Sequence, residues 1–194
     1  MRFGRGEPPA DWLVVGLGNP GSRYDWTPHN IGFDVLVELV RRWGLPKAKN
    51  KYGGRYASGR AGVGGPRVAV LQPQTFMNDS GNSVGPARGA LKLPLDNVLV
   101  IHDEIDLPFG DIRPRVGGGL AGHNGLKSLK AGLGSPDFAR IRIGVGRPDT
   151  TDPEIVSAHV LGKWQRPRAE VEALISEAAD VAQAIVSGEQ SLAP

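Results

Sequence analysis

The chain has 194 residues, with 23 Lys and Arg against 20 Asp and Glu, and it contains no cysteine. A chain of this length fits one domain whose core needs no disulfide or metal staple. The lack of cysteine excludes disulfides, a cysteine nucleophile and thiolate metal sites, and a formal charge of +3 is too small by itself to indicate a nucleic-acid partner.

The predicted elements alternate between strands and helices. The apolar run Trp12–Leu17 predicts a buried strand, and Thr27-Pro28 predicts the start of a helix with Thr27 as N-cap, which Gly44 ends. Further strands are predicted over 52–60, 67–71, 98–101, 111–116 and 138–145, and further helices from Asp79 or Ser80 towards Leu91, over 124–133, and from Pro153 and Pro167. This alternation predicts an α/β fold: a single domain with a mixed, mostly parallel twisted sheet and helices packed around it.

The two ends of the chain are expected to add little to that domain. Residues 1–11 contain Pro8-Pro9 and no apolar stretch, so we expect a flexible leader there rather than a signal peptide. We place the domain at 12–188 and a short tail at 189–194. No apolar run approaches the ~20 residues of a membrane span, so we expect a cytoplasmic protein without membrane contact, and a monomer by default.

The positive charge is concentrated in two segments. Between Arg41 and Arg67 there are eight cations and no carboxylate, and between Arg113 and Arg147 there are seven cations and one carboxylate, Asp137. Two interpretations of these segments remain open from charge alone. They are either solvated faces or the electrostatic footprint of bound phosphate groups.

A glycine motif follows the first predicted strand. The residues Gly16-Leu17-Gly18-Asn19-Pro20-Gly21 have the G-x-G-x-x-G spacing of a dinucleotide-binding loop. That hypothesis requires a helix to open at the glycines and to point its amides at a pyrophosphate. Here the predicted helix starts only at Thr27-Pro28, so a tight turn at the end of a strand is the better interpretation, although it leaves Asn19 without a role.

Polar side chains with catalytic potential occur near the predicted strand ends. His29 lies in the first turn of a predicted helix, and Asp103 directly follows an apolar strand. A carboxylate that holds one imidazole nitrogen protonated leaves the other nitrogen free as a base. The segment 117–125 is either a flexible glycine-rich loop with Asn124 as N-cap or a wall for a substrate backbone. No spacing of His, Asp and Glu indicates a metal site.

The motifs together resemble those of bacterial peptidyl-tRNA hydrolases, in the family's order and over roughly residues 12–165. The five matching motifs are Gly16-Leu17-Gly18-Asn19-Pro20-Gly21 with Tyr24 and His29-Asn30-Ile31-Gly32-Phe33; Thr75-Phe76-Met77-Asn78-Asp79-Ser80-Gly81; His102-Asp103-Glu104-Ile105-Asp106-Leu107-Pro108; Gly117-Gly118-Gly119 with Gly122-His123-Asn124-Gly125-Leu126-Lys127; and 138–146. Each motif is weak alone, but five in sequence are specific.

The resemblance implies a function in translation. It implies hydrolysis of the ester between peptide and tRNA in peptidyl-tRNA released from stalled ribosomes, which recycles the tRNA. It further implies His29 as the general base and Asp103 as the group that orients it. Because the chain has no cysteine and no visible metal set, direct attack by water without a cofactor is the simplest route for this hydrolysis. The family's cleft positions are carried over as Asn19, Tyr24, Met77, Asn78 and Asn124, and its tRNA phosphate contacts as Arg113 and Arg142.

The sequence departs from the family pattern at three places. Pro28 stands where the family usually has arginine, Leu120-Ala121 replaces a polar or glycine pair, and Gly85-Pro86 interrupts a segment that is normally helical. None of these removes a proposed catalytic group. Two other functions remain open: a non-catalytic RNA-binding relative, which could keep the same residues, and a nicotinamide oxidoreductase, which rests on the glycine spacing alone.

Overall fold

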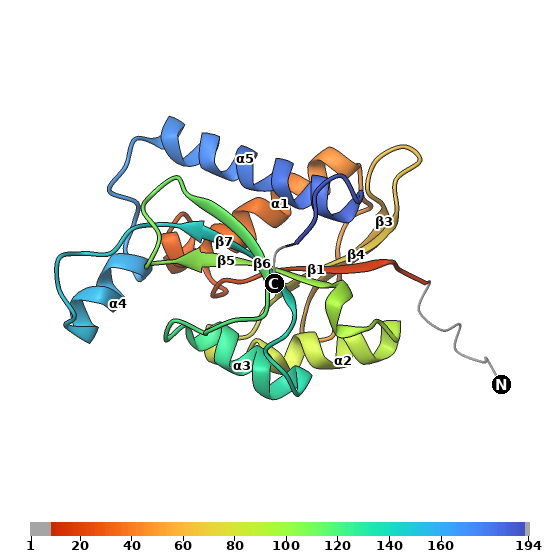
Figure 1. Ribbon diagram of the computed structural model, residues 1–194, viewed down its shortest axis with the longest axis horizontal. Coiled ribbons are helices and arrows are strands. Elements are labelled where there is room, and N and C mark those ends of the chain that lie inside the picture. The colour runs from red at the N-terminus through yellow and green to blue at the C-terminus, as the bar shows by residue number, and fades with distance from the viewer. Residues whose placement is uncertain (1–8, 193–194) are drawn as a thin grey trace.

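A seven-stranded sheet runs through the centre of the molecule in the computed structural model, which describes residues 9–192 (Figure 1). The strands are β1 (Trp12–Gly16), β2 (Lys49–Lys51), β3 (Gly54–Arg60), β4 (Arg67–Pro73), β5 (Val98–Glu104), β6 (Ile112–Val116) and β7 (Ala139–Gly144). Their order is β2-β3-β4-β1-β5-β7-β6. The central strands β4, β1, β5 and β7 are parallel, whereas β2, β3 and β6 pair antiparallel at the two edges. The predicted mixed α/β sheet is therefore confirmed, and its parallel part is the centre.

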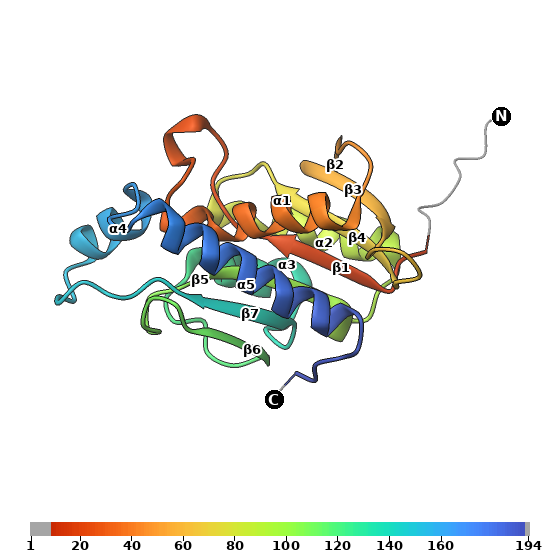
Figure 2. The ribbon, with the colours of Figure 1, turned by 90° about the horizontal axis from the view of Figure 1, so that it is seen from above.

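Helices cover both faces of this sheet. The helices α1 (Ile31–Trp43) and α5 (Arg168–Val186) lie side by side on one face, and α2 (Gly81–Leu91) and α3 (Asn124–Leu133) lie on the other (Figures 1 and 2). The helix α4 (Pro153–Leu161) lies beyond the carboxyl ends of the parallel strands. The expected leader over 1–11 falls mostly outside the described residues.

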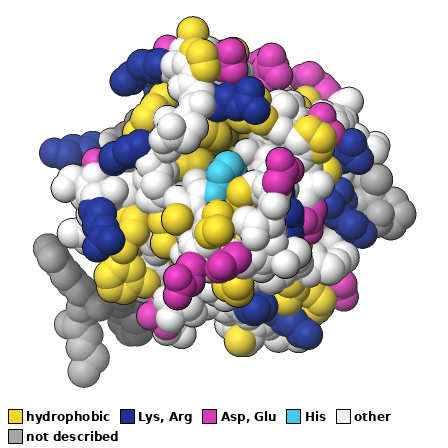
Figure 3. Space-filling model, turned by 90° about the vertical axis from the view of Figure 1, so that its left-hand side faces the viewer, with side chains coloured by type: hydrophobic (Ala, Val, Ile, Leu, Met, Phe, Trp, Pro, Cys, Tyr) yellow, Lys and Arg dark blue, Asp and Glu magenta, His cyan; other side chains and the backbone are white. Residues whose placement is uncertain are grey.

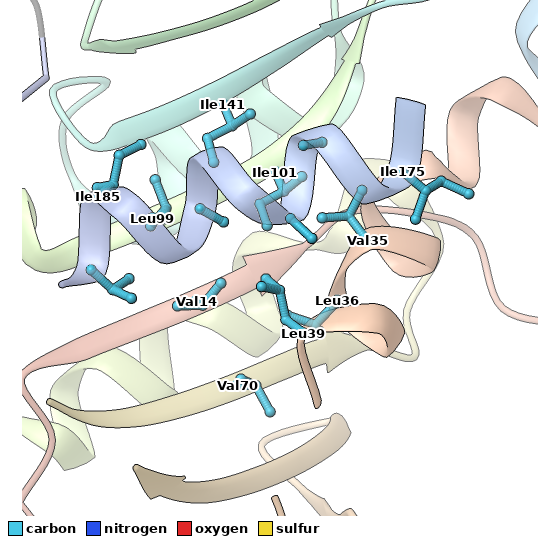
Figure 4. Close-up of a cluster of buried hydrophobic side chains, with 14 of the residues drawn as sticks. Val14, Val35, Leu36, Leu39, Val70, Leu99, Ile101, Ile141, Ile175 and Ile185 are labelled. Carbon is cyan, nitrogen blue, oxygen red and sulfur yellow. The ribbon is translucent and has the colours of Figure 1, made fainter. Parts of the chain in front are cut away.

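The core consists of two apolar layers, one on each face of the sheet. Beneath α1 and α5, Val14, Leu99, Ile101 and Ile141 of the strands pack against the two helices (Figure 4). The strand residues between them, such as Val100, point to the opposite face and pack under α2 and α3. Burial of both faces explains why β1 and β5 read as continuous apolar runs rather than alternating ones.

Two glycines let α1 approach β1 closely. A Cβ at Gly16 would lie 2.2 Å from the Gly32 carbonyl oxygen, and a Cβ at Gly32 would lie 2.3 Å from the Ile101 oxygen. Real Cβ atoms essentially never make such contacts, so only glycine allows backbone to meet backbone here. This contact holds the start of α1, and with it the preceding His29, over the carboxyl ends of β1 and β5.

Most predicted helix boundaries are confirmed. Gly44 ends α1 in the left-handed conformation with φ 60°, α3 spans the predicted residues, and Pro153 is the first residue of α4. The helix α2 is continuous through Pro86. Gly85-Pro86, a departure from the family pattern, therefore does not interrupt the helix.

Three local predictions are wrong. The helical segment does start after Thr27, with Pro28 in its first position, but its first turn is a 3-10 turn over Pro28–Asn30, and the Thr27 hydroxyl donates to the Tyr24 carbonyl at 2.8 Å instead of accepting a capping hydrogen bond. The N-cap of α3 is His123, not Asn124. The edge strand β2 was missed because its sequence Lys49-Asn50-Lys51 carries no apolar periodicity.

Candidate active site

A cavity of about 620 Å³ opens beyond the carboxyl ends of β1 and β5, where open α/β sheets place their sites. Seen from the left-hand side of Figure 1, the surface is hollowed around a histidine side chain with hydrophobic side chains beside it (Figure 3). Six of the seven residues predicted for catalysis or the cleft line this cavity: Asn19, His29, Met77, Asn78, Asp103 and Asn124. They come from five separate segments of the chain that the fold brings to one place.

The centre of the cavity holds a carboxylate between two imidazoles. His29 Nδ1 lies 2.9 and 3.0 Å from the two Asp103 carboxylate oxygens. His123 Nε2 lies 2.9 Å from Asp103 Oδ1. The Asp103 side chain is 2% exposed, and the His29 side chain is 13% exposed. Asp103 is therefore sequestered from water, whereas the His29 ring borders the cavity.

The surrounding backbone fixes the tautomer of His123. Its Nδ1 accepts hydrogen bonds from the backbone amides of Gly125 and Leu126, at 3.1 and 3.4 Å. An atom that accepts from N–H groups carries no proton, so the His123 proton resides on Nε2 and is donated to Asp103. His29 in turn donates from Nδ1 to Asp103. Its Nε2 has no hydrogen-bond partner among the described residues and is available as a base.

Electrostatics in the cavity favour an ionised Asp103 beside the imidazoles. Burial alone would raise the pKa of Asp103, but the electrostatic attraction and hydrogen bonds of His29 and His123 hold it well below its usual value. Burial alone would lower the pKa of His29, but the charge and hydrogen bond of Asp103 outweigh it and raise that pKa above 6.5. Burial, followed by the nearby His123, lowers the pKa of His102 to about 3, so His102 stays neutral.

The same three side chains form a group that can hold a metal ion, which the sequence spacing did not suggest. The ligand atoms of His29, Asp103 and His123 lie within 4.8 Å of one another. The two histidine contacts to Asp103 have hydrogen-bond lengths, and both donor nitrogens are protonated in the assigned tautomers. A metal would require at least one of these nitrogens to lose its proton. The arrangement is therefore that of a hydrogen-bonded relay.

Asn19 connects the glycine turn to both sides of the cavity. Its backbone N–H donates to Asn30 Oδ1, and its carbonyl accepts from Asn30 Nδ2, both at 2.9 Å. Its side-chain Oδ1 accepts from the Met77 backbone N–H at 2.7 Å. Because Oδ1 is engaged, the group that Asn19 offers to the cavity is its Nδ2 donor. Interpreting the glycine motif as a tight turn left Asn19 without a role, and these hydrogen bonds supply one.

The glycines of that turn serve close packing. A Cβ at Gly18 would lie 2.7 Å from the Phe33 ring. No helix opens at these glycines, since the next helical segment is the short 3-10 turn over Ser22–Tyr24. The geometry that places a pyrophosphate on a helix N-terminus is absent from this described loop.

The other predicted residues lie around the cavity or outside it. Asn78 and Asn124 are exposed at its mouth, and Met77 is buried in its wall. Tyr24 is not among the lining residues. Arg113 and Arg142 lie opposite each other on β6 and β7, outside the cavity. The rest of the wall includes the polar side chains of Glu104 and Ser157 and an apolar part formed by Phe76, Ile105, Val156, Val160 and Leu161.

Comparison with known proteins places this site in a family. The family model described as peptidyl-tRNA hydrolase matches residues 13–193. The chain is 46% identical over 180 residues to a peptidyl-tRNA hydrolase of Rhodopseudomonas palustris, covering 92% of this chain and 87% of that protein. It is 48% identical over 169 residues to one from Halalkalibacterium halodurans, covering 87% and 88%. The chain belongs to the peptidyl-tRNA hydrolase family.

The fold agrees with this peptidyl-tRNA hydrolase assignment. The crystal structure of peptidyl-tRNA hydrolase from Acinetobacter baumannii superposes with a TM-score of 0.80 at 39% identity, covering 95% of this chain and 93% of that one. Within the described part of the chain, none of the helices combines the length and hydrophobicity needed to traverse a bilayer.

Within this peptidyl-tRNA hydrolase fold, sequence reasoning missed two side chains. His123 was quoted only as part of a motif, and because histidine is not among the preferred N-cap residues, nothing in the sequence signalled its role at the start of α3. Arg140 was counted with the other cations of its segment, but the structure buries it completely. Arg140 and Arg142 lie on one face of β7, as strand alternation requires, and the glycine-rich loop covers Arg140.

Proposed function

We propose that this protein hydrolyses the ester bond of peptidyl-tRNA by direct attack of water, with His29 as general base. The observation that carries the proposal is the free Nε2 of an imidazole whose Nδ1 is bound by a buried carboxylate inside a cavity. Nε2 removes a proton from water as its oxygen attacks the ester carbonyl. The imidazolium then returns the proton to the leaving ribose oxygen, giving a free peptide carboxyl and a tRNA with a free terminal hydroxyl.

Asp103 supports both stages of this reaction. It fixes the His29 tautomer that leaves Nε2 unprotonated, and its charge stabilises the imidazolium that forms after proton transfer. His123, held by the α3 amides, donates to the same carboxylate and fixes its orientation. His29 is thus oriented by a chain of hydrogen bonds that ends on a helix backbone.

Asn19 is the group we assign to the developing oxyanion. Its Oδ1 is engaged by Met77, so its Nδ2 faces the cavity with donors to offer. A donor aimed at the tetrahedral oxygen typically contributes about 2.7–4 kcal/mol to transition-state stabilisation. Asn78 and Asn124, exposed at the mouth, then bind the peptide backbone, and the apolar wall accepts a side chain of the peptide.

The tRNA is proposed to bind along β6 and β7. Arg113 and Arg142 are directly opposite in register, and Arg115 pairs with Arg140, so these cations share one face. Burial, followed by Arg115, lowers the pKa of Arg142, and the Arg142 Nε has no hydrogen-bond partner among the described residues. Cations gathered at the cost of mutual repulsion favour a bound polyanion such as phosphate.

The substitution His29→Ala tests the catalytic role. We expect cleavage of purified peptidyl-tRNA to fall by orders of magnitude while tRNA binding is retained. Parental cleavage by His29→Ala would refute the role of His29. Binding of RNA by the parent protein without any ester cleavage would instead favour the non-catalytic RNA-binding alternative.

Charge reversal tests the tRNA face. We expect Arg113→Glu and Arg142→Glu to weaken tRNA binding and to reduce the slope of log affinity against log salt by about 1 for each lost phosphate contact. Lys130, exposed on α3, supplies a matched Lys130→Glu control. Equal affinity of the parent and both arginine variants at every salt concentration would show that these cations are only solvated. We further expect a monomer acting in the cytoplasm, and sedimentation of the purified protein tests the monomer.

A further inference from the structure

Arg140 is a buried cation without a carboxylate partner. It has no exposed surface, and no described Asp or Glu forms an ion pair with it. Its guanidinium donates instead to three backbone carbonyls: Nη1 to Gly119 and Nη2 to Gly118, both at 2.8 Å, and Nη2 to Pro136 at 3.2 Å. Burial, followed by the repulsion of Arg115 and Arg142, lowers its pKa to about 10, so the side chain remains charged at neutral pH.

Such an arrangement is a poor device for stability alone. A buried charge costs free energy that carbonyl dipoles offset only in part, and apolar side chains of similar volume are often as stable or more so. A guanidinium does have one property that an apolar side chain lacks. Its planar set of donors fixes the positions of several acceptors at once.

The acceptors of Arg140 belong to the glycine-rich loop beside the cavity. Gly117 and Gly118 have φ of 64° and 91°, and Ala121 has φ of 47°. The loop therefore adopts positive φ angles repeatedly, a conformation that residues other than glycine rarely take. Arg140 is the only described donor to the Gly118 and Gly119 carbonyls. Without it these carbonyls would lose their anchor beneath the loop.

The loop leads directly to the catalytic cavity. The His123 N–H donates to the Leu120 carbonyl at 2.8 Å, and the His123 ring reaches Asp103. Asn124 is the next residue and lines the mouth. The path from Arg140 to the catalytic carboxylate thus consists of the carbonyls of Gly118 and Gly119, one short loop and the His123 ring.

We propose that Arg140 is a positioning residue for catalysis: its guanidinium fixes the glycine-rich loop so that His123 donates to Asp103 and Asn124 faces the substrate. Arg140 itself touches neither substrate nor the reacting atoms. The inference rests on the proposed mechanism, in which Asp103 orients His29, and it assigns a task to a cation that shares a face with the proposed phosphate contacts but is itself buried.

The test compares Arg140→Met, Arg140→Lys and a neighbouring control, Arg142→Met, which lies two residues along the same face of β7. For each variant, kcat and KM on peptidyl-tRNA, the thermal midpoint and the imidazole N–H signals of ¹⁵N-histidine-labelled protein are measured. The His123 Nε2–H signal is identified by its loss in His123→Asn. This signal reports the contact with Asp103 whether or not the protein is active.

In Arg140→Met we expect kcat to fall by ~10- to 100-fold, as for a small displacement of catalytic groups, with little change in the thermal midpoint. The His123 Nε2–H signal should broaden or disappear. Arg140→Lys keeps a charge and donors and should retain a higher kcat than Arg140→Met. Arg142→Met should instead raise KM and leave the His123 signal in place.

Three results would overturn the proposal. They are a parental kcat in Arg140→Met, an unchanged His123 signal in that variant, or a loss of activity in both Arg140 variants that only follows the thermal midpoint. If Arg140→Met does not fold, Arg140→Lys becomes the deciding variant. One ammonium group cannot reproduce the planar set of guanidinium hydrogen bonds to the loop carbonyls, so kcat should still fall in folded Arg140→Lys protein. Parental activity of His29→Ala would refute the mechanism separately, and the His123 signal would still report on the loop.

Discussion

Replacing Asp103 with asparagine exchanges one acceptor oxygen for an NH₂ group at the most constrained point of the site. Asp103 Oδ1 faces both His29 Nδ1 and His123 Nε2 at 2.9 Å, and Oδ2 faces His29 Nδ1 at 3.0 Å. His123 cannot become an acceptor at Nε2, because its Nδ1 already accepts from Gly125 and Leu126. The oxygen of the new amide must therefore stay at the Oδ1 position, and the NH₂ group lies against His29 Nδ1.

That contact is unfavourable for the His29 tautomer that the proposed mechanism needs. Two donors 3.0 Å apart repel, so His29 shifts its proton to Nε2 and loses the free nitrogen that is proposed to serve as base. In a histidine–aspartate pair of this kind, the same exchange lowers kcat by about 10⁴. Allowing for a relaxed contact, we expect kcat to fall ~10³- to 10⁴-fold, equivalent to about 4–5 kcal/mol of barrier.

Kinetics on purified peptidyl-tRNA over a range of pH test this expectation. In the parent protein, kcat/KM should rise with pH through a limb above 6.5, because burial and Asp103 together leave the pKa of His29 raised and only the neutral base is active. In Asp103→Asn the charge that raises this pKa is gone, so any residual activity should show the limb at lower pH. Asp106→Asn is the matched control, since Asp106 is exposed and pairs with Arg147. A kcat within tenfold of the parent, or an unmoved limb, would refute the reasoning.

Three further predictions concern neighbouring groups. His123→Asn keeps a good N-cap for α3, but its side chain no longer reaches Asp103. Loss of one hydrogen bond to a charged group should lower kcat by about 10- to 100-fold, while the thermal midpoint stays close to that of the parent protein. A parental kcat would contradict this. Asn19→Asp keeps the acceptor for the Met77 amide but removes the Nδ2 donor, so kcat should fall ~10²- to 10³-fold with KM little changed, and an unaffected kcat would remove Asn19 from the oxyanion site. Burial, followed by repulsion from Asp25, raises the pKa of Asp34 from 3.8 to about 6, so this carboxyl stabilises the folded state below pH 3.8 and loses that contribution as pH rises through 6. Asp34→Asn should therefore stabilise the protein above pH 7, by up to about 3 kcal/mol, but not at pH 4. Equal effects in thermal melts at both pH values would rule out titration of Asp34 as the cause.

The sequence allowed prediction of the site residues whose position follows from the ends of strands and the starts of helices. Asp103 follows a buried strand, and parallel sheets gather functional groups at their carboxyl ends. His29 follows Thr27-Pro28, which marks the start of a helical segment, and this suffices to place it at the same edge. The motif order then suggested that Asn19, Asn78 and Asn124 converge, and all three line the cavity.

The parts that escaped prediction depend on contacts between distant segments. Nothing in the residues around His123 indicates that its ring caps α3 with one nitrogen and binds Asp103 with the other, since that requires the positions of both elements. The burial of Arg140 depends on a loop folding over β7, whereas alternation along the strand predicts only which face it occupies. The edge strand β2 forms because β3 offers a partner, and its lysines carry no pattern of their own.

Because a single imidazole both caps α3 and binds Asp103, the start of this helix and the Asp103 carboxylate move together. The amides of Gly125 and Leu126 are shielded from solvent exchange as long as the His123 ring stays in place. Any opening that releases the ring from Asp103 by rotation also exposes these amides. Hydrogen exchange at these two backbone positions therefore measures, in protein without substrate, how often the site is correctly assembled.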